Sequence, residues 1–334
     1  MKSLKLAVLD QSVSLAGSSE DAAIRDTVSL AEHCERLGYS RFWLSEHHGL
    51  PTIVGSAPEI LMAAIAARTS TIRIGSAGVM LPHYSALKVA EQFRVLEALA
   101  PGRIDLGVGR APGGDMRTAR ALNPNAAVAA EDFPVQVRDL QAWTSVGRHA
   151  GITAHPLGPH APEIWILGSS DYGAQLAAHF GLPYAFAYFF TDGQGADLAM
   201  ALYRERFQPS ERHPQPQATL CIWALAAESD EEAQRLALSR DRWRIDRQRG
   251  ALGPLQSPEA IEARGFSDAE LATLAPMRAK AFVGSPATVG AKIRKLASDF
   301  ALDEVVVNTW AFEPAVRRRS YALLAQEFGL PASA

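Results

Sequence analysis

The stretch Ile72–Val108 decides the fold: IRIGSAGV (Ile72–Val79) and RIDLGV (Arg103–Val108) flank the segment ALKVAEQFRVLEA (Ala86–Ala98). The two flanking runs are short, mostly apolar and bounded by Gly, Pro and Ser, which is typical of buried strands. The apolar residues of the middle segment recur at helical spacing. A strand, a helix and a strand in this order predict a parallel β-α-β unit.

The same alternation continues in both directions along the chain. Further strands are predicted at Leu4–Leu9, Arg41–Leu44, Ile164–Leu167, Tyr184–Phe186, Leu220–Ala226 and Glu304–Asn308. Helical patterns between the strands include Ala22–Leu37, Glu59–Thr69, Gly173–His179 and Pro286–Phe300. Eight strands that alternate with helices favour the α/β class and a closed (β/α)8 barrel, the TIM barrel, over an open doubly wound sheet.

One segment interrupts the alternation. Between the seventh and eighth predicted strands, residues Ala237–Lys280 contain many arginines with Pro and Gly in place of a simple crossover. Long excursions in compact domains are often functional, so we interpret this insertion as a lid, although a plain helical insertion would have the same pattern. No shift in composition marks a boundary, and residues 1–334 are expected to form a single domain.

Composition and charge exclude several classes of protein. The chain has 334 residues, 48% of them hydrophobic and 21% charged, which fits a globular protein with a large core. The net charge of -3 offers no basic field for a nucleic acid. Two cysteines are too few for a disulfide framework, and no apolar run is long enough to cross a membrane. We therefore expect a cytoplasmic protein with neither nucleic acid nor membrane as a partner.

Unusual side chains follow the predicted strands. In a barrel, the functional site lies at the carboxyl ends of the strands, because the loops that follow them meet there. The segments in question are Ser45-Glu46-His47-His48, Ser76-Ala77-Gly78, Gly109-Arg110, Gly168-Ser169-Ser170 and Asn308-Thr309-Trp310. Imidazole, carboxylate, guanidinium and hydroxyl groups should therefore converge on one end of the barrel.

The Glu46-His47-His48 run offers an imidazole that titrates near neutral pH and that a carboxylate could orient, which suits proton transfer. Metal binding is the rival interpretation. Adjacent histidines on an extended segment point in opposite directions, and neither an H-x-H nor an H-E-x-x-H spacing is present, so no metal site is expected. A structural role, with one histidine packed and the other exposed, also remains open.

Three glycine-containing segments each have two interpretations. The small residues Gly75–Gly78 either let a flat ligand approach the backbone or mark a bulge in the strand. Arg110 is either a fixed cation that faces an anionic ligand or half of a surface ion pair. Gly168-Ser169-Ser170 either directs backbone N–H groups and hydroxyls at a phosphate or simply caps the next helix. The G-x-G before Arg110 is no dinucleotide fingerprint, because Pro112 stands where the third glycine belongs.

The arginine-rich run in the insertion also has two interpretations. A solvated helix face would pair its arginines with Asp241 and Asp246, whereas a lid would close over an anionic cofactor and exclude water. The arginines are Arg240, Arg242, Arg244, Arg247 and Arg249.

Taken in order, these segments resemble the bacterial-luciferase-like flavin monooxygenases, in particular their FMN-utilising branch. The resemblance spans nearly the whole chain and is carried by six blocks: Phe42–His48, Ile74–Pro82, Ala100–Arg110, Ile166–Ser170, Gly181–Ala187 and Phe282–Pro286.

The resemblance implies a role for individual residues. His47 corresponds to the family's catalytic imidazole, with Glu46 beside it, and Ala77-Gly78 corresponds to a non-proline cis peptide against which the flavin ring lies. Arg110 corresponds to an arginine that contacts the cofactor. The cofactor-binding residues implied are Ser76, Ala77, Gly78, Gly109, Arg110, Gly168, Ser169, Ser170 and Tyr188, the last where luciferase has an aromatic residue beside the flavin.

Two positions depart from the family pattern. Gly109 stands where luciferase carries a cysteine near the reactive flavin carbon, which puts light emission in doubt. Gly173 stands where a hydroxyl residue often helps to hold the phosphate.

The function that the resemblance implies is oxygenation of a small organic substrate by dioxygen, through a flavin peroxide formed on reduced FMN. A separate flavin reductase would supply the reduced FMN, and the chain would form a homodimer. Three alternatives stay open: a deazaflavin-dependent hydride-transfer enzyme, a non-catalytic flavin-binding protein, and a metal-dependent barrel hydrolase, which the ligand spacing disfavours.

Overall fold

A computed structural model describes residues 4–110, 114–145 and 147–332. Within these residues, eight parallel strands follow one another around a closed barrel, because the last strand pairs with the first. The strands in barrel order are β1 (Lys5–Asp10), β2 (Arg41–Leu44), β3 (Arg73–Met80), β4 (Ile104–Gly109), β7 (Glu163–Gly168), β8 (Tyr184–Phe186), β9 (Ala218–Ala226) and β11 (Glu304–Asn308). The predicted TIM barrel and all eight predicted strands are confirmed.

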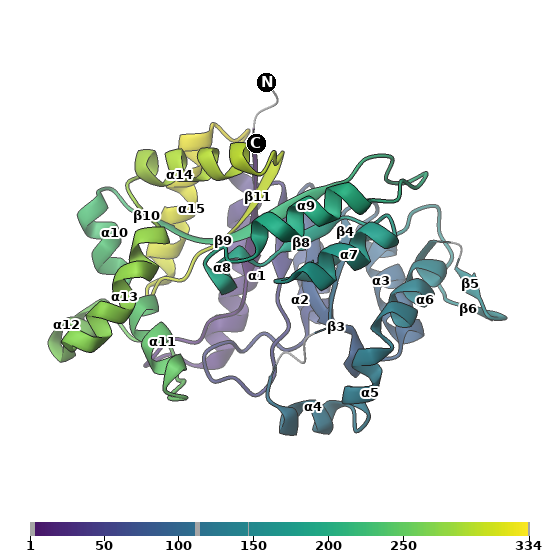
Figure 1. Cartoon of the computed structure of the whole chain (residues 1–334), viewed down its shortest axis with the longest axis horizontal. Helices are drawn as coiled ribbons and strands as arrows, with labels where there is room; N and C mark the ends of the chain where they lie inside the picture. The colour runs from purple at the N-terminus through teal and green to yellow at the C-terminus, as the bar shows by residue number, and fades with distance from the viewer. Residues whose placement is uncertain (1–3, 111–113, 146, 333–334) are drawn as a thin grey trace.

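A layer of helices surrounds the strands (Figure 1). Each predicted helix is present within a few residues of its expected bounds. The helices that connect the strands and follow the last one are α1 (Glu20–Arg36), α2 (Pro58–Ala66), α3 (Ala86–Leu99), α6 (Phe133–Ser145), α7 (Asp171–His179), α9 (Ala196–Arg206), α14 (Pro286–Asp299) and α15 (Pro314–Phe328).

Shorter elements lie between these units. They are the 3-10 turn η1 (Leu81–His83), the helices α4 (Met116–Leu122), α5 (Ala126–Glu131) and α8 (Tyr188–Thr191), and the hairpin strands β5 (Arg148–His149) and β6 (Ile152–Thr153). None of the helices in the described residues is both long and apolar enough to span a membrane.

The segment between β9 and β11 is longer than a single crossover. It contains α10 (Asp230–Leu236), α11 (Leu238–Gln248), α12 (Pro258–Arg264), α13 (Asp268–Lys280) and the short strand β10 (Phe282–Gly284) before α14. Strand β10 pairs with β9 beyond the point where β11 pairs with it. Ser267 and Glu270 form a reciprocal capping box that starts α13 and satisfies two backbone N–H groups.

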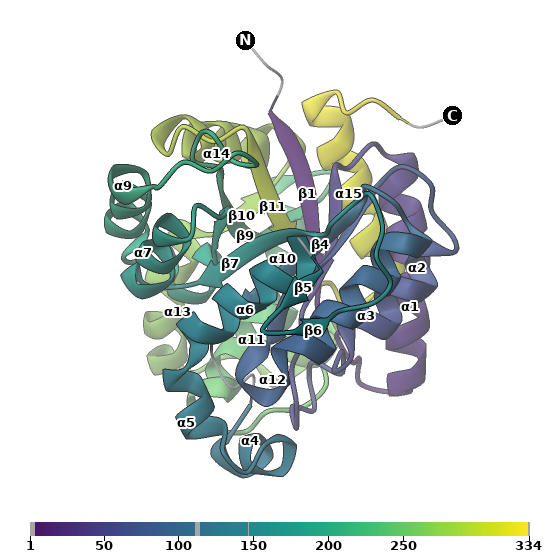
Figure 2. The ribbon, with the colours of Figure 1, turned by 90° about the vertical axis from the view of Figure 1, so that its right-hand side faces the viewer.

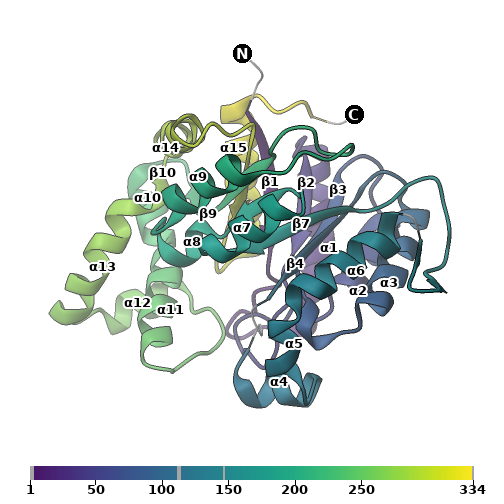
Figure 3. The same ribbon diagram turned by 45° about the vertical axis from the view of Figure 1, so that its right-hand side comes forward.

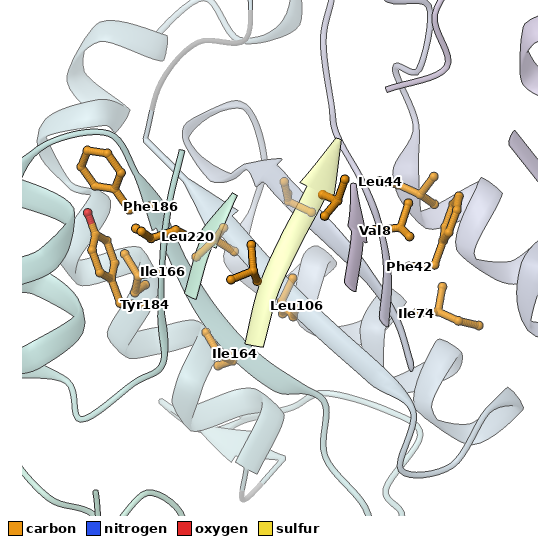
Figure 4. Packing of buried hydrophobic residues seen from close by; sticks show 14 of the residues in the cluster. Val8, Phe42, Leu44, Ile74, Leu106, Ile164, Ile166, Tyr184, Phe186 and Leu220 are labelled. Atoms are coloured by element: carbon orange, nitrogen blue, oxygen red, sulfur yellow. The ribbon is translucent and has the colours of Figure 1, made fainter. Parts of the chain in front are cut away.

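Alternate residues of each strand serve two cores, as the period of two along a strand requires. The outward-facing residues join the helices in one large apolar cluster, part of which is shown in Figure 4 with Val8, Phe42 and Ile74 labelled. The inward-facing residues fill the barrel and include Ala7, Leu9, Trp43, Trp165, Ala185, Cys221 and Val306. The barrel interior is therefore a packed core and not a pore.

An ionic network closes the end of the barrel where the strands begin. Arg41, the first residue of β2, donates to Asp105 at 2.8 Å and to Glu304 at 2.9 Å. Arg73 forms an ion pair with the same Asp105 at 2.5 Å. Asp105 is fully buried. Burial alone would lower the pKa of Arg41, but the negative charges of Asp105, Glu304 and Glu163 raise it. This end of the interior is thus filled by paired charges.

The opposite end, where the strands finish, is flanked by the longer connections. In Figures 1 and 3, α4 and α5 lie on one side of this end, and α11 to α13 lie on the other. Figure 2 shows that β1 begins and α15 ends at the other end of the barrel. We refer to the end where the strands finish as the barrel mouth.

Candidate active site

The barrel mouth gathers residues from separate strands. His47, Arg110, Ser169 and Trp310 each follow a different barrel strand, and Ala77 lies in the second half of β3. All these strands are parallel, so their carboxyl ends share the mouth. The structure thereby brings together candidates that are up to 263 residues apart in sequence (310 − 47).

Glu46 is buried and receives three hydrogen bonds. Its Oε1 accepts from Nε2 of His48 and from the hydroxyl of Tyr84, both at 2.8 Å, and its Oε2 accepts from the backbone N–H of Met80 at 3.1 Å. Burial, followed by the Glu46 charge, raises the pKa of Tyr84. The carboxylate therefore orients His48 and ties the loop after β2 to the end of β3.

His47 faces away from that carboxylate. Its Nδ1 lies 3.1 Å from Oγ of Ser45, and its backbone N–H donates to the carbonyl of Gly55 at 3.0 Å. Burial lowers the pKa of His47 to about 4, and the opposing charge of Glu46 does not offset this effect. The imidazole is therefore neutral near pH 7 and can accept a proton or a hydrogen bond.

The peptide bond between Ala77 and Gly78 is cis, as the resemblance implied. The pairing of β3 with β4 shifts register between Ser76 and Val79, so the bulge interpretation of this segment is confirmed. A side chain at Gly78 would lie 2.3 Å from Leu167, and the Ser76 hydroxyl donates to the carbonyl of Gly107 at 2.8 Å. Protein packing alone thus requires small residues here. Ala77 remains half-buried against the interior core.

Arg110 is exposed and stacks on an aromatic ring. Its guanidinium carbon lies 4.1 Å from the ring centre of Tyr172, in the first turn of α7. Within the described residues its guanidinium has no carboxylate partner, so the surface ion pair is not found there. Stacking instead holds a cation beside the amino end of α7, a place where an anion is stabilised.

The amino end of α7 carries the two predicted serines. Ser170 is the N-cap residue, but its hydroxyl makes no capping hydrogen bond. Neither Ser169 nor Ser170 has a side-chain hydrogen bond to another described residue, which leaves both hydroxyls and the first N–H groups of the helix available. Simple capping therefore does not account for the two serines.

The two glycines of this turn lie close together. A side chain on Gly173 would come within 3.4 Å of the Tyr184 ring and 3.5 Å of the Gly168 Cα atom. A small side chain at Gly173 would therefore make ordinary van der Waals contacts here. The exposed carboxylate of Asp171 is also in the first turn and opposes an anion placed too near it.

Gly109 has room for a side chain. A Cβ atom added there would meet only the sulfur of Met80, at 3.8 Å. Packing therefore does not exclude a cysteine at this position, and the glycine leaves open space beside β4.

The structure does not bring Tyr188 to the other candidates. Its ring packs 6.2 Å from that of Phe282, within the outer core between barrel and helices. The next residue, Phe189, packs against both the interior core and a second apolar cluster, which includes Trp223 and Trp310. Phe189 is thus the aromatic residue of this segment that faces the interior, a position that was not predicted from the sequence.

Helix α11 lies across the mouth. The indole N–H of Trp243 donates to the hydroxyl of Thr52, after β2, at 3.0 Å, and its ring centre lies 4.7 Å from that of Trp310, after β11. Arg240 stacks over Trp223 of β9 at 4.2 Å. The helix therefore contacts residues from three strands. Trp243 was missed because it lies within the arginine-rich run, where charged residues dominate the pattern.

The comparisons with known proteins agree with this architecture. The family model described as luciferase-like monooxygenase matches residues 4–303. The Bacillus subtilis (strain 168) protein YwcH is 40% identical over 97% of this chain and 99% of its own length. The luciferase-like monooxygenase of Escherichia coli (strain K12) is 37% identical over 96% of each chain. The N-acetyl-S-alkylcysteine monooxygenase of Bacillus subtilis (strain 168) is 34% identical over 96% of this chain and 97% of its own.

Solved structures extend the comparison. The crystal structure of apo-MsnO8 is 35% identical, with a TM-score of 0.90 over 99% of this chain and 100% of its own. The oxygenating constituent of 3,6-diketocamphane monooxygenase from Pseudomonas putida, in complex with FMN, has a TM-score of 0.74 at 20% identity over 97% of each chain. An F420-dependent secondary alcohol dehydrogenase has a TM-score of 0.59 at 13% identity over 98% and 99%. The last two share the fold with this chain.

Proposed function

Because the chain belongs to the luciferase-like monooxygenase family, we propose that it is an FMN-dependent monooxygenase that oxygenates a small organic substrate with dioxygen. Reduced FMN is supplied by a separate flavin reductase. The observation that carries the proposal is the convergence of a neutral imidazole at His47, the half-buried Ala77 and the stacked cation of Arg110 on one barrel mouth.

The residues present fit FMN. The free hydroxyls of Ser169 and Ser170, the N–H groups at the start of α7 and the guanidinium of Arg110 together suit a phosphate. The small, half-buried side chain of Ala77, which packs against the interior core, suits a flat ring laid against it. When bound, reduced FMN supplies the electrons that activate dioxygen, so that one oxygen atom enters the substrate and the other forms water.

The protein's own contribution is protonation control and exclusion of water. The neutral imidazole of His47 accepts or donates a hydrogen bond at the reacting oxygen, and Ser45 holds Nδ1 so that the other ring nitrogen is available. Glu46 acts through His48, because it contacts that ring and not the ring of His47. Helix α11 serves as the lid, which restricts solvent access at the mouth.

Two other functions are compatible with the fold. A deazaflavin-dependent hydride transfer is one, since an F420-dependent alcohol dehydrogenase shares the fold. A flavin-binding protein without catalysis is the other, but it has no need for a half-buried, neutral imidazole at the mouth.

A stopped-flow experiment tests the proposal. The protein is mixed anaerobically with photoreduced FMN and then with oxygenated buffer, while the return of oxidised-flavin absorbance is followed. We expect reoxidation to be slower than that of free FMN, and His47→Ala to speed it up and release more hydrogen peroxide. Reoxidation at the rate of free flavin would exclude the monooxygenase, and an unchanged course in His47→Ala would exclude a role for His47.

We also propose that the chain forms a homodimer through α2 and α3. Ile60 on α2 and Val95 and Leu99 on α3 are exposed by 67%, 47% and 62%, and the two helices pack side by side. Symmetric dimers commonly bury such apolar groups. Analytical ultracentrifugation of Ile60→Glu, with Glu91→Gln as a control on the same helix pair, should give a monomer for the first and a dimer for the second. A monomeric wild-type protein contradicts the proposal.

A further inference from the structure

Helix α11 turns one face to the barrel mouth. Residues 240, 243, 244 and 247 are spaced as one helical stripe, and every one of them contacts a residue that lies in or follows a barrel strand. Arg240 stacks on Trp223, Trp243 contacts Thr52 and Trp310, and Arg247 stacks at 4.8 Å over Phe190, which follows β8. Arg244 forms an ion pair with Asp192. Positive charge thus faces the site.

The other two arginines of the run, one in α11 and one at its C-cap, form ion pairs away from this face. Arg242 lies 2.9 Å from carboxylate oxygens of both Asp246 and Glu270, and Arg249 lies 2.7 Å from Glu270. Asp241 pairs with Arg278 of α13 at 2.6 Å. Of the predicted helix-face pairs, the one that involves Asp246 is therefore present, and it lies toward α13.

Arg240 is a buried cation without an anionic partner. It is 8% exposed, and among the described residues its guanidinium has neither an ion pair nor a hydrogen bond, only the face of Trp223. Burial, the largest effect, lowers the pKa of Arg240 to about 9, and the positive charge of Arg244 lowers it further. The two carboxylates whose charges act on it, Asp192 and Asp241, are already engaged by Arg244 and Arg278. Buried charges are normally paired, so this position lacks a counter-ion.

Arg247 stands at the outer end of the same stripe. It is exposed, has no carboxylate partner in the described part of the chain, and is held by stacking on Phe190. Burial is the main cause of the low pKa of His47, and the charge of Arg247 makes a smaller contribution. An anion bound by Arg240 and Arg247 would lie against the face of α11 that is turned to the mouth.

We propose that Arg240 and Arg247 bind a carboxylate group of the organic substrate, so that the enzyme acts on small carboxylic acids. This inference rests on the proposed function. The aromatic rings of Trp223, Trp243 and Phe190 frame the two cations and provide apolar surface for the rest of the molecule. The FMN phosphate has its own set of donors around Arg110, after β4 and β7, whereas this pair of arginines lies over β8 and β9.

A pair of probes that differ in charge but scarcely in shape tests the inference without flavin. Benzoate and benzamide are titrated into the full-length protein by calorimetry and by thermal shift. We expect saturable binding of benzoate with a rise in Tm, and binding of benzamide that is about tenfold weaker or more. Equal affinity for the two probes, or no binding of benzoate, would overturn the carboxylate site.

Variants assign the binding to the two arginines. Arg240→Gln and Arg247→Gln should each weaken benzoate binding several-fold, and the double variant should abolish the preference over benzamide. Arg249→Gln, at the residue that ends α11 and pairs with Glu270, is the matched control and should bind benzoate as the wild type does. Arg247 is exposed, so its variant gives an answer even if replacing the buried Arg240 impairs folding.

The affinity for FMN separates this inference from the proposed function. The double variant should bind FMN as tightly as the wild type. A loss of FMN affinity with unchanged benzoate binding would assign the arginines to the cofactor and overturn the inference. Conversely, the stopped-flow experiment could show FMN reoxidation at the rate of free flavin while benzoate binding still depends on the two arginines. That result would support the anion site and exclude the monooxygenase.

Discussion

Nε2 of His48 donates to Oε1 of Glu46 at 2.8 Å, so the carboxylate of the Glu-His-His run orients the second histidine and not the first. His47, one residue earlier, points to Ser45. Adjacent side chains on an extended segment point in opposite directions, and here this separates a structural imidazole from a functional one. The two histidines should therefore respond differently to mutation of Glu46.

Glu46→Gln should destabilise the protein. Both oxygens of the Glu46 carboxylate accept hydrogen bonds, three in all. A glutamine has only one oxygen, so its NH2 group would face at least one of these donors. We expect a loss of about 1–3 kcal/mol in the free energy of unfolding, measured in urea. Glu231→Gln, exposed in the first turn of α10, is the control and should change little. Equal effects of the two substitutions would contradict the network.

The low pKa of His47 predicts an acid-dependent loss of stability. Its pKa is about 4 in the folded protein against an ordinary value of 6.5, so between these values the unfolded chain binds more protons. Stability is then greatest above pH 6.5 and falls as the pH drops toward 4. His47→Gln removes this contribution. The stability of the variant relative to wild type should rise from pH 7 to pH 5 in urea unfolding; a constant difference would mean that His47 titrates normally.

Two glycines on β4 should differ sharply in their tolerance of alanine. A Cβ atom on Gly107 would lie 2.2 Å from the carbonyl oxygen of Ser76, whereas one on Gly109 would meet nothing closer than 3.8 Å. Gly107→Ala should cost about 3 kcal/mol or more in unfolding free energy, because backbone would have to move. Gly109→Ala should change it by less than about 1 kcal/mol. Similar melting temperatures for the two variants would disprove the packing at the bulge.

Arg110→Gln should weaken FMN binding. The guanidinium is held over Tyr172 beside the free serine hydroxyls, and a charge-assisted contact to phosphate contributes about 1.5–3 kcal/mol, or roughly tenfold to a hundredfold in Kd. Fluorescence quenching of FMN measures the change, with riboflavin, which lacks the phosphate, as the matched ligand. Riboflavin affinity should not respond to the substitution. If it falls as much as that of FMN, Arg110 contacts the ring or acts on folding.

The barrel could be predicted because its signals are local. Each strand is a short apolar run with its own boundaries, and a repeat of eight such runs specifies the closed sheet. Strand β10 was missed: Phe282–Gly284 is three residues long, and its pairing with β9 depends on a partner about 58 residues away (282 − 224). The hairpin of β5 and β6, with two residues in each strand, escapes prediction for the same reason.

The position of a candidate residue at the mouth could be predicted where that residue comes shortly after a strand. His47 and Arg110 are placed by β2 and β4, so the barrel alone brings them to the mouth. Tyr188 and Phe189 lie beyond β8, where a shift of one position along the chain decides which of the two rings faces the interior. The stripe of Arg240 and Arg247 depends on how α11 docks, which is set by long-range contacts of Trp243.

The ionic network of Arg41 and Asp105 at the far end has a consequence for the order of events. The paired charges and the packed side chains above them close that end of the barrel, so within the described part of the chain a ligand can approach the interior only from the mouth. If the proposed flavin and substrate both enter there, the molecule that binds deeper must bind first and leave last. The order of binding is then set by position and not by the relative affinities of the two molecules.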